Sequence, residues 1–241
     1  MDITMTDKKL YARLRGTLKR DWINIPDYGY QGTGAPGLIL EELLGFHGSN
    51  RDTPDAGKWE IKFLGKTAGL LTLFHLEAEP KGHMHHMVRT FGWPDAKGRT
   101  SFRHTIHGRS DRGFYITNES SQISVCNDNE NDIISPYWTH DRLLNAFASK
   151  LRRLILVRGT KKNNRVKYET AYLYWEPQIT LFANAIERGI VAIDFDARTN
   201  NSRGLRNHGT KFRVKYDNLH HLYNHHQKFN GSPVKENPLI N

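Results

Sequence analysis

The sequence predicts a protein of the α/β or α+β class with a mixed sheet. Segments that alternate every second residue, as strands do, are interspersed with segments whose apolar residues recur every three or four positions, as in helices. The 241 residues, 37% of them hydrophobic, can bury a real core in one large domain or two small lobes. No repeat or low-complexity tract is present, and we expect two lobes that divide near residues 95–135.

In the first hundred residues the pattern predicts three helices and two strands. The helices are expected over 6–21, over 37–45 and over 83–93, the last two ending at or near a glycine. Apolar and charged residues alternate over 59–64, and a second strand-like segment follows over 70–75. Because these two segments are close in sequence, we expect them to pair as a hairpin.

The rest of the chain is expected to be richer in strands. Strands are predicted at Phe102–His107, Phe114–Thr117, Ile123–Cys126, Leu154–Val157, Val166–Trp175, Ile190–Phe195 and Thr210–Val214. Helices are predicted over 138–150, over 177–188 with a proline in the first turn, and over 217–228 with Asp217 as its cap. A loop rich in glycine and arginine is expected over 198–209.

One segment combines a turn with a short strand that carries alternating charges. Strand alternation puts Glu60 and Lys62 on the same face, and Asp55, in the turn before, can swing its carboxylate toward that face. Two carboxylates and one ammonium group would then converge, as phosphodiester hydrolysis with a hard divalent cation requires. The same pattern also occurs on solvated strands, so the surroundings must decide. Glu41 and Glu42 are adjacent in a predicted helix, and one of them can face this site while the other faces solvent.

The composition favours a polyanionic partner. Lys and Arg number 35 against 25 Asp and Glu, which gives a formal net charge of +10 at pH 7. Nucleic acid is the common partner of such a chain, and a merely soluble basic protein is the alternative. The single cysteine, Cys126, excludes an internal disulfide and a thiolate-rich zinc site. Neither a leader nor an apolar segment of membrane length is visible, so we expect a cytoplasmic protein without a membrane partner.

Thirteen histidines are many for a chain of this length. They include one group and two pairs, which are His83, His85 and His86, His220 and His221, and His225 and His226. His221 and His225, four residues apart in a predicted helix, could share a zinc ion, but no third ligand completes either set. Structural or solvated histidines are the favoured interpretation. In a DNA-binding protein, histidine can also donate to guanine in the major groove.

Four motifs follow one another along the chain. They are Gly37-x-x-Leu40-Glu41, Asp55-x4-Glu60-x-Lys62, Leu71-Thr72-Leu73-Phe74-His75 and Asn207-His208-Gly209-Thr210-x-Phe212-Arg213. Together they span about 37–215 and resemble the MvaI/BcnI restriction endonucleases, relatives of the mismatch-repair nickase MutH. The resemblance implies a two-lobed PD-(D/E)xK fold with a mixed central sheet and a DNA-binding cleft. Residues 1–241 would form one nuclease domain, with a catalytic lobe over about 1–95, a recognition-rich part over 135–228 and a flexible tail over 229–241.

The resemblance also implies roles for individual residues. Asp55 and Glu60 would be metal ligands, Lys62 would orient the attacking water, and Glu41 would be an additional acidic residue. The DNA-binding residues would be His75, Asp194, Arg198, Arg206, His208 and Arg213. His75 and Asp194 are similar to the BcnI branch, which reads a central C or G between CC and GG. Family members tend to carry His-Asp-His-Gly or His-Asp-Arg-Gly where this chain has Arg206-Asn207-His208-Gly209, which leaves the target sequence open.

The leading hypothesis is a type II restriction endonuclease that hydrolyses double-stranded DNA at a short CCNGG-like site. By resemblance it would use Mg²⁺, replaceable by Mn²⁺, act as a monomer through sequential nicking, and share its system with a DNA methyltransferase. A MutH-like strand-nicking repair enzyme, with the same chemistry, is one alternative. A DNA-binding protein that has lost cleavage is another, and the intact set of Asp55, Glu60 and Lys62 argues against it.

Overall fold

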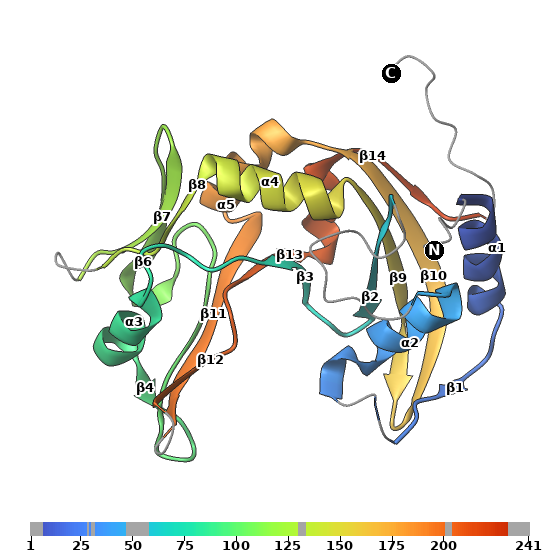
Figure 1. The fold of residues 1–241 in the computed structure, drawn as a ribbon, viewed down its shortest axis with the longest axis horizontal. Coiled ribbons are helices and arrows are strands. Elements are labelled where there is room, and N and C mark those ends of the chain that lie inside the picture. The colour runs from blue at the N-terminus through green and yellow to red at the C-terminus, as the bar shows by residue number, and fades with distance from the viewer. Residues whose placement is uncertain are drawn as a thin grey trace, which may run out of the picture. The chain divides into compact units, whose positions relative to one another are not determined.

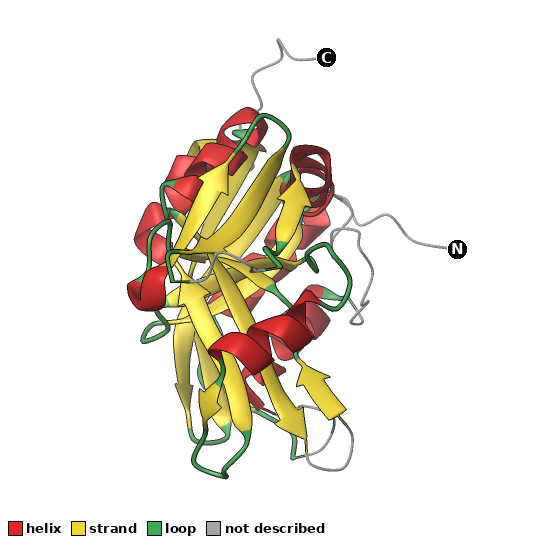
Figure 2. Cartoon of the chain, turned by 90° about the vertical axis from the view of Figure 1, so that its left-hand side faces the viewer, coloured by secondary structure: helices red, strands yellow, loops and turns green. Residues whose placement is uncertain are grey.

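The computed structural model describes residues 7–27, 29, 32–46, 58–129, 134–200 and 204–230. The chain divides into two compact units, and strands outnumber helices in both (Figures 1 and 2). Unit 1 consists of Met1–Ala68, Ser149–Pro177 and Tyr223–Asn241, and unit 2 consists of Gly69–Ala148 and Gln178–Leu222. Each unit is therefore assembled from segments that are far apart in the sequence.

The described residues of unit 1 form a five-stranded sheet and two α-helices. Its helical segments are α1 (Asp7–Leu18), the 3-10 turn η1 (Gly32–Gly34) and α2 (Ala35–Leu44). Its strands are β1 (Ile23–Asn24), β2 (Glu60–Gly65), β9 (Arg153–Lys162), β10 (Arg165–Pro177) and β14 (Tyr223–Lys228). The helices predicted over 6–21 and 37–45 are confirmed. The second one ends at Gly45, whose φ of 90° lies in the left-handed region that favours glycine.

The sheet of unit 1 is mixed, as the sequence predicts. The order is β1-β10-β9-β2, with β14 also paired to β10; β2 and β9 run parallel, and the other pairs are antiparallel. The predicted hairpin between 59–64 and 70–75 is wrong, because Glu60 pairs in register with Leu154 of β9. Leu154–Val157 is buried throughout, as is usual for a strand that is covered on both faces.

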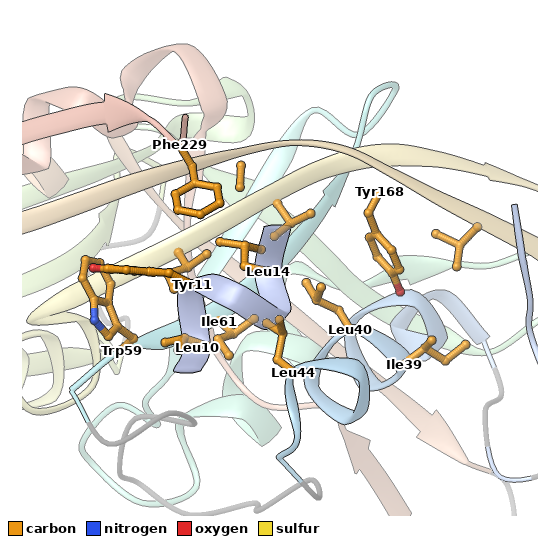
Figure 3. Close-up of a cluster of buried hydrophobic side chains, with 14 of the residues drawn as sticks. Leu10, Tyr11, Leu14, Ile39, Leu40, Leu44, Trp59, Ile61, Tyr168 and Phe229 are labelled. Atoms are coloured by element: carbon orange, nitrogen blue, oxygen red, sulfur yellow. The ribbon is translucent and has the colours of Figure 1, made fainter. Parts of the chain in front are cut away.

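The core of unit 1 packs both helices against the sheet (Figure 3). Leu10 and Leu14 of α1 and Leu40 of α2 are buried together with Tyr168 of β10 and with Trp59, the residue just before β2. The Tyr168 hydroxyl donates a hydrogen bond of 2.6 Å to the carbonyl oxygen of Pro36, and burial raises the pKa of this hydroxyl. Trp59 and Ile61, which flank Glu60 at the start of β2, belong to this core and are held in place by it.

In the part of unit 2 that the structure describes, the strands form two antiparallel sheets. The six-stranded sheet has the order β3-β13-β11-β5-β4, with β12 also paired to β11, and the three-stranded sheet has the order β6-β7-β8. The strands are β3 (Leu70–His75), β4 (Trp93–Pro94), β5 (Thr100–Ile106), β6 (Phe114–Asn118), β7 (Gln122–Asn127), β8 (Tyr137–Thr139), β11 (Val191–Asn200), β12 (Gly204–Asn207) and β13 (Lys211–Lys215). The helical segments are α3 (His83–Phe91), η2 (Asp111–Gly113), α4 (His140–Leu151, whose last residues belong to unit 1), η3 (Ile179–Leu181), α5 (Phe182–Glu187) and η4 (Tyr216–Leu222).

The six-stranded sheet has one apolar face and one polar face. Along β11, Ile193, Phe195 and Ala197 are buried in the core, and the residues between them point to the opposite face. The apolar face packs against α3, whose Met84 and Met87 are buried. We define the polar face by the side chains that the strand register places together, which are Arg103, Thr105, Asp194, Asp196, Arg198, Arg206, Lys211 and Arg213.

Two predictions for the second half of the chain are wrong, and a third is confirmed in part. Much of the expected loop 198–209 is strand, because β11 extends to Asn200 and β12 pairs back on it. The expected helix 217–228 is the 3-10 segment η4 followed by β14, where the rings of His226 and Tyr174 stack across the strands. The helix expected over 177–188 is confirmed in part, because η3 and α5 cover 179–187, but Pro177 ends β10 instead of lying in the first turn of the helix. In the two wrong predictions, pairing with a neighbouring strand overrides the local preference of the sequence.

Candidate functional site

Glu60 and Lys62 form a close pair on one face of β2. The Lys62 Nζ donates a hydrogen bond of 2.8 Å to Glu60 Oε1. The Glu60 side chain is only 3% exposed and that of Lys62 is 18% exposed. A strand with solvated charges would leave the carboxylate in water, so the solvated interpretation of this motif does not hold for Glu60. A buried carboxylate requires a charged or hydrogen-bonding partner, which Lys62 provides.

The start of β2 is held in place by contacts to α1 and β9. The Trp59 indole Nε1 donates a hydrogen bond of 3.3 Å to Asp7 Oδ1 at the beginning of α1. The Arg153 guanidinium lies 5.6 Å from the centre of the Trp59 ring, and its Nη1 lies 3.9 Å from Asp7 Oδ2. The residue before Glu60 is thus fixed on two sides, which restricts where the Glu60 carboxylate can lie.

A buried tyrosine lies near the Glu60 carboxylate. The Tyr223 hydroxyl at the start of β14 donates a hydrogen bond of 2.9 Å to the carbonyl oxygen of Leu151. Burial, and then the nearby Glu60 carboxylate, raise the pKa of Tyr223 well above its usual value. Tyr223 is therefore neutral at physiological pH and adds no second negative charge beside Glu60.

The other predicted catalytic residues are placed only in part. Asp55 lies outside the described residues. Glu41, in α2, is half-buried and its neighbour Glu42 is exposed, which agrees with the expectation that the two point in different directions. Whether Glu41 faces Glu60 stays a prediction.

The chemistry of the donors at β2 suits a hard cation. A carboxylate beside an ammonium group offers oxygen ligands, which Mg²⁺ prefers, and differs from the nitrogen and sulfur ligands typical of zinc. Within the described ranges, no group of three or more His, Cys, Asp or Glu side chains is placed to hold a metal ion. His83, in the first histidine group, is buried, and its Nδ1 donates instead to the carbonyl oxygen of Pro80 at 3.0 Å.

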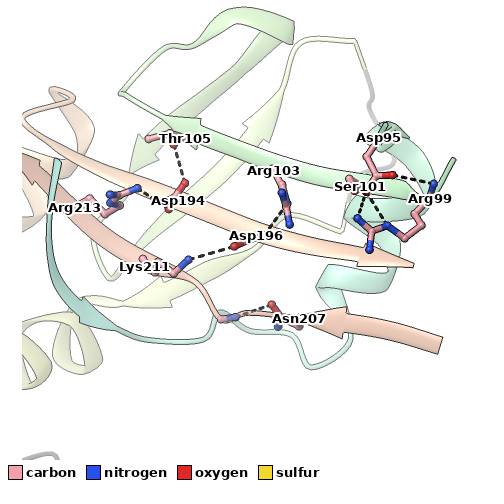
Figure 4. Close-up of polar contacts among 11 residues, drawn as sticks. Asp95, Arg99, Ser101, Arg103, Thr105, Asp194, Asp196, Asn207, Lys211 and Arg213 are labelled. Atoms are coloured by element: carbon pink, nitrogen blue, oxygen red, sulfur yellow. Dashed lines mark hydrogen bonds and ion pairs between the residues drawn. The ribbon is translucent and has the colours of Figure 1, made fainter. Parts of the chain in front are cut away.

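The polar face of unit 2 carries a network of charged groups (Figure 4). Asp194 accepts hydrogen bonds from Thr105 Oγ1 at 2.7 Å and from Arg213 Nη1 at 3.1 Å. Asp196, two residues further along β11, lies 3.0 Å from Arg103 Nε and 3.5 Å from Lys211 Nζ. With the two remaining arginines, the polar face has five cationic and two acidic side chains, which favours an anionic partner.

Beyond these pairs, the β11–β12 hairpin and the residues after it carry Arg198, Arg206 and His208. Arg198 and Arg206 are cross-strand partners in the β11–β12 hairpin. Partial burial and the neighbouring guanidinium groups lower the pKa of Arg198. The backbone N–H of His208 donates to the carbonyl oxygen of Asp196 at 2.8 Å. Burial and nearby cations lower the pKa of the His208 imidazole, despite Asp196. The His208 ring is therefore neutral near pH 7.

The six residues predicted to bind DNA all lie in unit 2. Four are on the polar face, and His208 follows β12 directly. His75, at the end of β3, is exposed and is the cross-strand partner of Lys211. The prediction missed Arg103, Thr105, Asp196 and Lys211 of the polar face. The alternation of charged and apolar residues over 191–200 could have indicated Asp196, if the segment from 198 had not been assigned to a loop.

Comparison with known proteins identifies the class of the chain as a DNA-cutting hydrolase. The model of the MvaI/BcnI restriction endonuclease family matches residues 12–223, and the chain belongs to this family of site-specific nucleases. No curated protein matches the chain. The resemblance inferred from the four sequence motifs is therefore confirmed.

Two solved structures have the same fold. The structure of the restriction endonuclease MvaI–cognate DNA substrate complex is 23% identical to this chain, with a TM-score of 0.78, and the match covers 93% of this chain and 99% of that one. The structure of MvaI in the absence of DNA is 21% identical, with a TM-score of 0.55, covering 93% and 98%. The predicted mixed α and β class and the restriction endonuclease-like fold are confirmed. In the described part of the chain, no helix has the length and apolar character needed to span a membrane.

Proposed function

We propose that this chain is a Mg²⁺-dependent type II restriction endonuclease that cuts double-stranded DNA at a short CCNGG-like site. Family membership supports the endonuclease activity. The observation that carries the metal-dependent chemistry is the buried Glu60 carboxylate, paired at 2.8 Å with the Lys62 ammonium group. Desolvating such a charge is costly, and costs of this kind are typical of functional sites.

In this proposal Asp55 and Glu60 hold the ion, and Glu41 adds a further acidic group. When bound, Mg²⁺ stabilises the charge that develops on the phosphate and makes water a better nucleophile. The Lys62 ammonium group orients the attacking water, and its hydrogen bond to Glu60 keeps it in place. Mn²⁺ should replace Mg²⁺, because both ions prefer the same oxygen ligands.

The polar face and its neighbours would recognise the DNA. Arg206 and the neutral His208 can donate to guanine edges in the major groove, and Arg213 is oriented for the same task by Asp194. Arg198 and His75 complete the set of six predicted DNA-binding residues. One of the solved structures of the same fold is a complex of MvaI with its cognate DNA substrate, which supports double-stranded DNA as the partner.

The chain offers one Asp-Glu-Lys set, so we propose that a monomer cuts one strand at a time. Cleavage of both strands then requires release and rebinding in the opposite orientation on a nearly symmetric site. A DNA methyltransferase in the same system would protect the host's own copies of the site.

The test is plasmid cleavage by the purified protein with Mg²⁺, with Mn²⁺ or with EDTA. Wild type should cut with either metal and not in EDTA. The D55A and E60A variants should not cut but should still bind DNA, because only the ion ligands are removed. E41A should cut more slowly than E42A, the matched control whose side chain is exposed. Cleavage by D55A at the wild-type rate would show that the site is assigned wrongly.

A further inference from the structure

The two carboxylates of the polar face are held in different ways (Figure 4). Each oxygen of Asp194 accepts a good hydrogen bond, Oδ1 from Thr105 at 2.7 Å and Oδ2 from Arg213 at 3.1 Å. The Asp194 side chain is only 13% exposed. Both oxygens of Asp194 are thus engaged within the protein, where they fix the direction of the Arg213 guanidinium, and little of the side chain is left accessible.

Asp196 is the more exposed of the two carboxylates and retains acceptor capacity. Its Oδ1 is buried and lies 3.0 Å from Arg103 Nε, without the geometry of a hydrogen bond. Among the described residues, its Oδ2 accepts a single hydrogen bond, a long one of 3.5 Å from Lys211 Nζ. The side chain is 26% exposed although Oδ1 is buried, so its exposed surface is shared between Oδ2 and the side-chain carbons. A carboxylate oxygen accepts two hydrogen bonds, so Oδ2 can take another donor.

The position of Asp196 is central on the polar face. It lies on β11 between Asp194 and Arg198, and its cross-strand partner on β5 is Arg103. Residues two apart on a strand are separated by roughly 6.8 Å, which is about twice the 3.4 Å spacing of successive nucleotides on one DNA strand. Neighbouring side chains of the polar face can therefore meet different base pairs of the same groove.

We propose that Asp196 determines part of the sequence specificity, with Oδ2 accepting a hydrogen bond from the N4 amino group of a cytosine in the major groove. The proposal rests on the proposed function above. Carboxylates accept from cytosine N4, whereas guanine and thymine present acceptors at the corresponding edge and repel them. Arg103 and Lys211 offset the charge that would otherwise repel Asp196 from the phosphates. Adenine also presents a donor, its N6 amino group, so adenine is the base that competes with cytosine for Asp196.

The experiment selects bound duplexes from a pool with randomised base pairs, in EDTA so that no strand is cut, and sequences them. Wild type is compared with D196A, D196N and the control D128A. Asp128 carries the same charge but pairs with Arg109 beside the three-stranded sheet. D196A should lose the preference for C·G at one base pair, or at its symmetry-related copy, by roughly 5- to 150-fold, the usual value of one base contact. The other positions and the D128A selection should match wild type.

The isosteric D196N variant keeps the packing and tests the chemistry. Its amide can both donate and accept, so the preference at that base pair should move from cytosine toward adenine. The inference is overturned if D196A keeps every base preference, or if D196A and D196N lose preference equally at all positions. If the wild-type protein selects no base pair at all, the proposed sequence-specific function itself is wrong. This result differs from one in which wild type is selective and only the role of Asp196 fails.

Discussion

Replacing Lys62 by Met should destabilise the protein, because it leaves the Glu60 carboxylate buried without its cation. Removing one partner of a buried ion pair costs about 3–5 kcal/mol. Lys62 is 18% exposed, so water can partly replace it, and we expect about 2–3 kcal/mol. For a chain of this size, that loss lowers the melting temperature by roughly 4–12 °C.

The assay is thermal unfolding in EDTA, so that no metal ion contributes. Lys66 is the matched control, because it pairs with Glu169 at a similar 2.7 Å but is 55% exposed. K66M should change the unfolding free energy by about 0–1 kcal/mol. The double variant E60Q/K62M should recover much of the stability lost in K62M and still fail to cut DNA. Equal melting temperatures of K62M, K66M and wild type would refute a charged pair at β2.

Three further outcomes test recognition, strand order and pH dependence. R206A and H208A should slow cleavage at the cognate site by roughly 5- to 150-fold and leave non-specific binding and its salt dependence intact; equal losses on random DNA would make these residues phosphate contacts. Supercoiled plasmid should pass through a nicked species at a rate proportional to enzyme, and direct linearisation with second-order dependence on enzyme would contradict a monomer. Burial lowers the pKa of His83 and His104, so below about pH 6.5 the unfolded chain binds more protons than the folded chain. The free energy of unfolding should therefore fall as the pH drops, by up to about 1.4 kcal/mol per pH unit for each histidine. In urea unfolding at pH 7 and pH 5.5, the free energy of unfolding of H83Q should change less between the two pH values than that of wild type. An equal change in both proteins would contradict the role of His83.

Much of the local structure could be predicted because single segments carry the signal. The leucines of α1 recur every four residues, and Gly45 ends α2 with a left-handed φ. The alternation over 59–64 correctly indicated that Glu60 and Lys62 share a face. What failed was pairing between segments. The sequence has no local sign that β2 pairs with β9, nearly a hundred residues later, rather than with β3.

Because strand pairing between distant segments could not be predicted, the residues of the polar face could not be grouped from the sequence either. Glycine and arginine over 198–209 favour a loop when taken alone, and only pairing with β11 makes Gly204–Asn207 a strand. Once that register is known, Arg103 and Asp196 are cross-strand partners, and the alternation along both strands places them on the polar face. The identity of charged residues could be read from the sequence, but their grouping required the strand order.

The central claim is sequence-specific, metal-dependent cleavage of both DNA strands by this chain. The most direct measurement is digestion of a plasmid of known sequence with Mg²⁺, followed by sequencing of every end. The account predicts that all ends fall at one position within a single short CCNGG-like site, and that E60A produces none. Ends at unrelated sequences, or no ends with either Mg²⁺ or Mn²⁺, would contradict it.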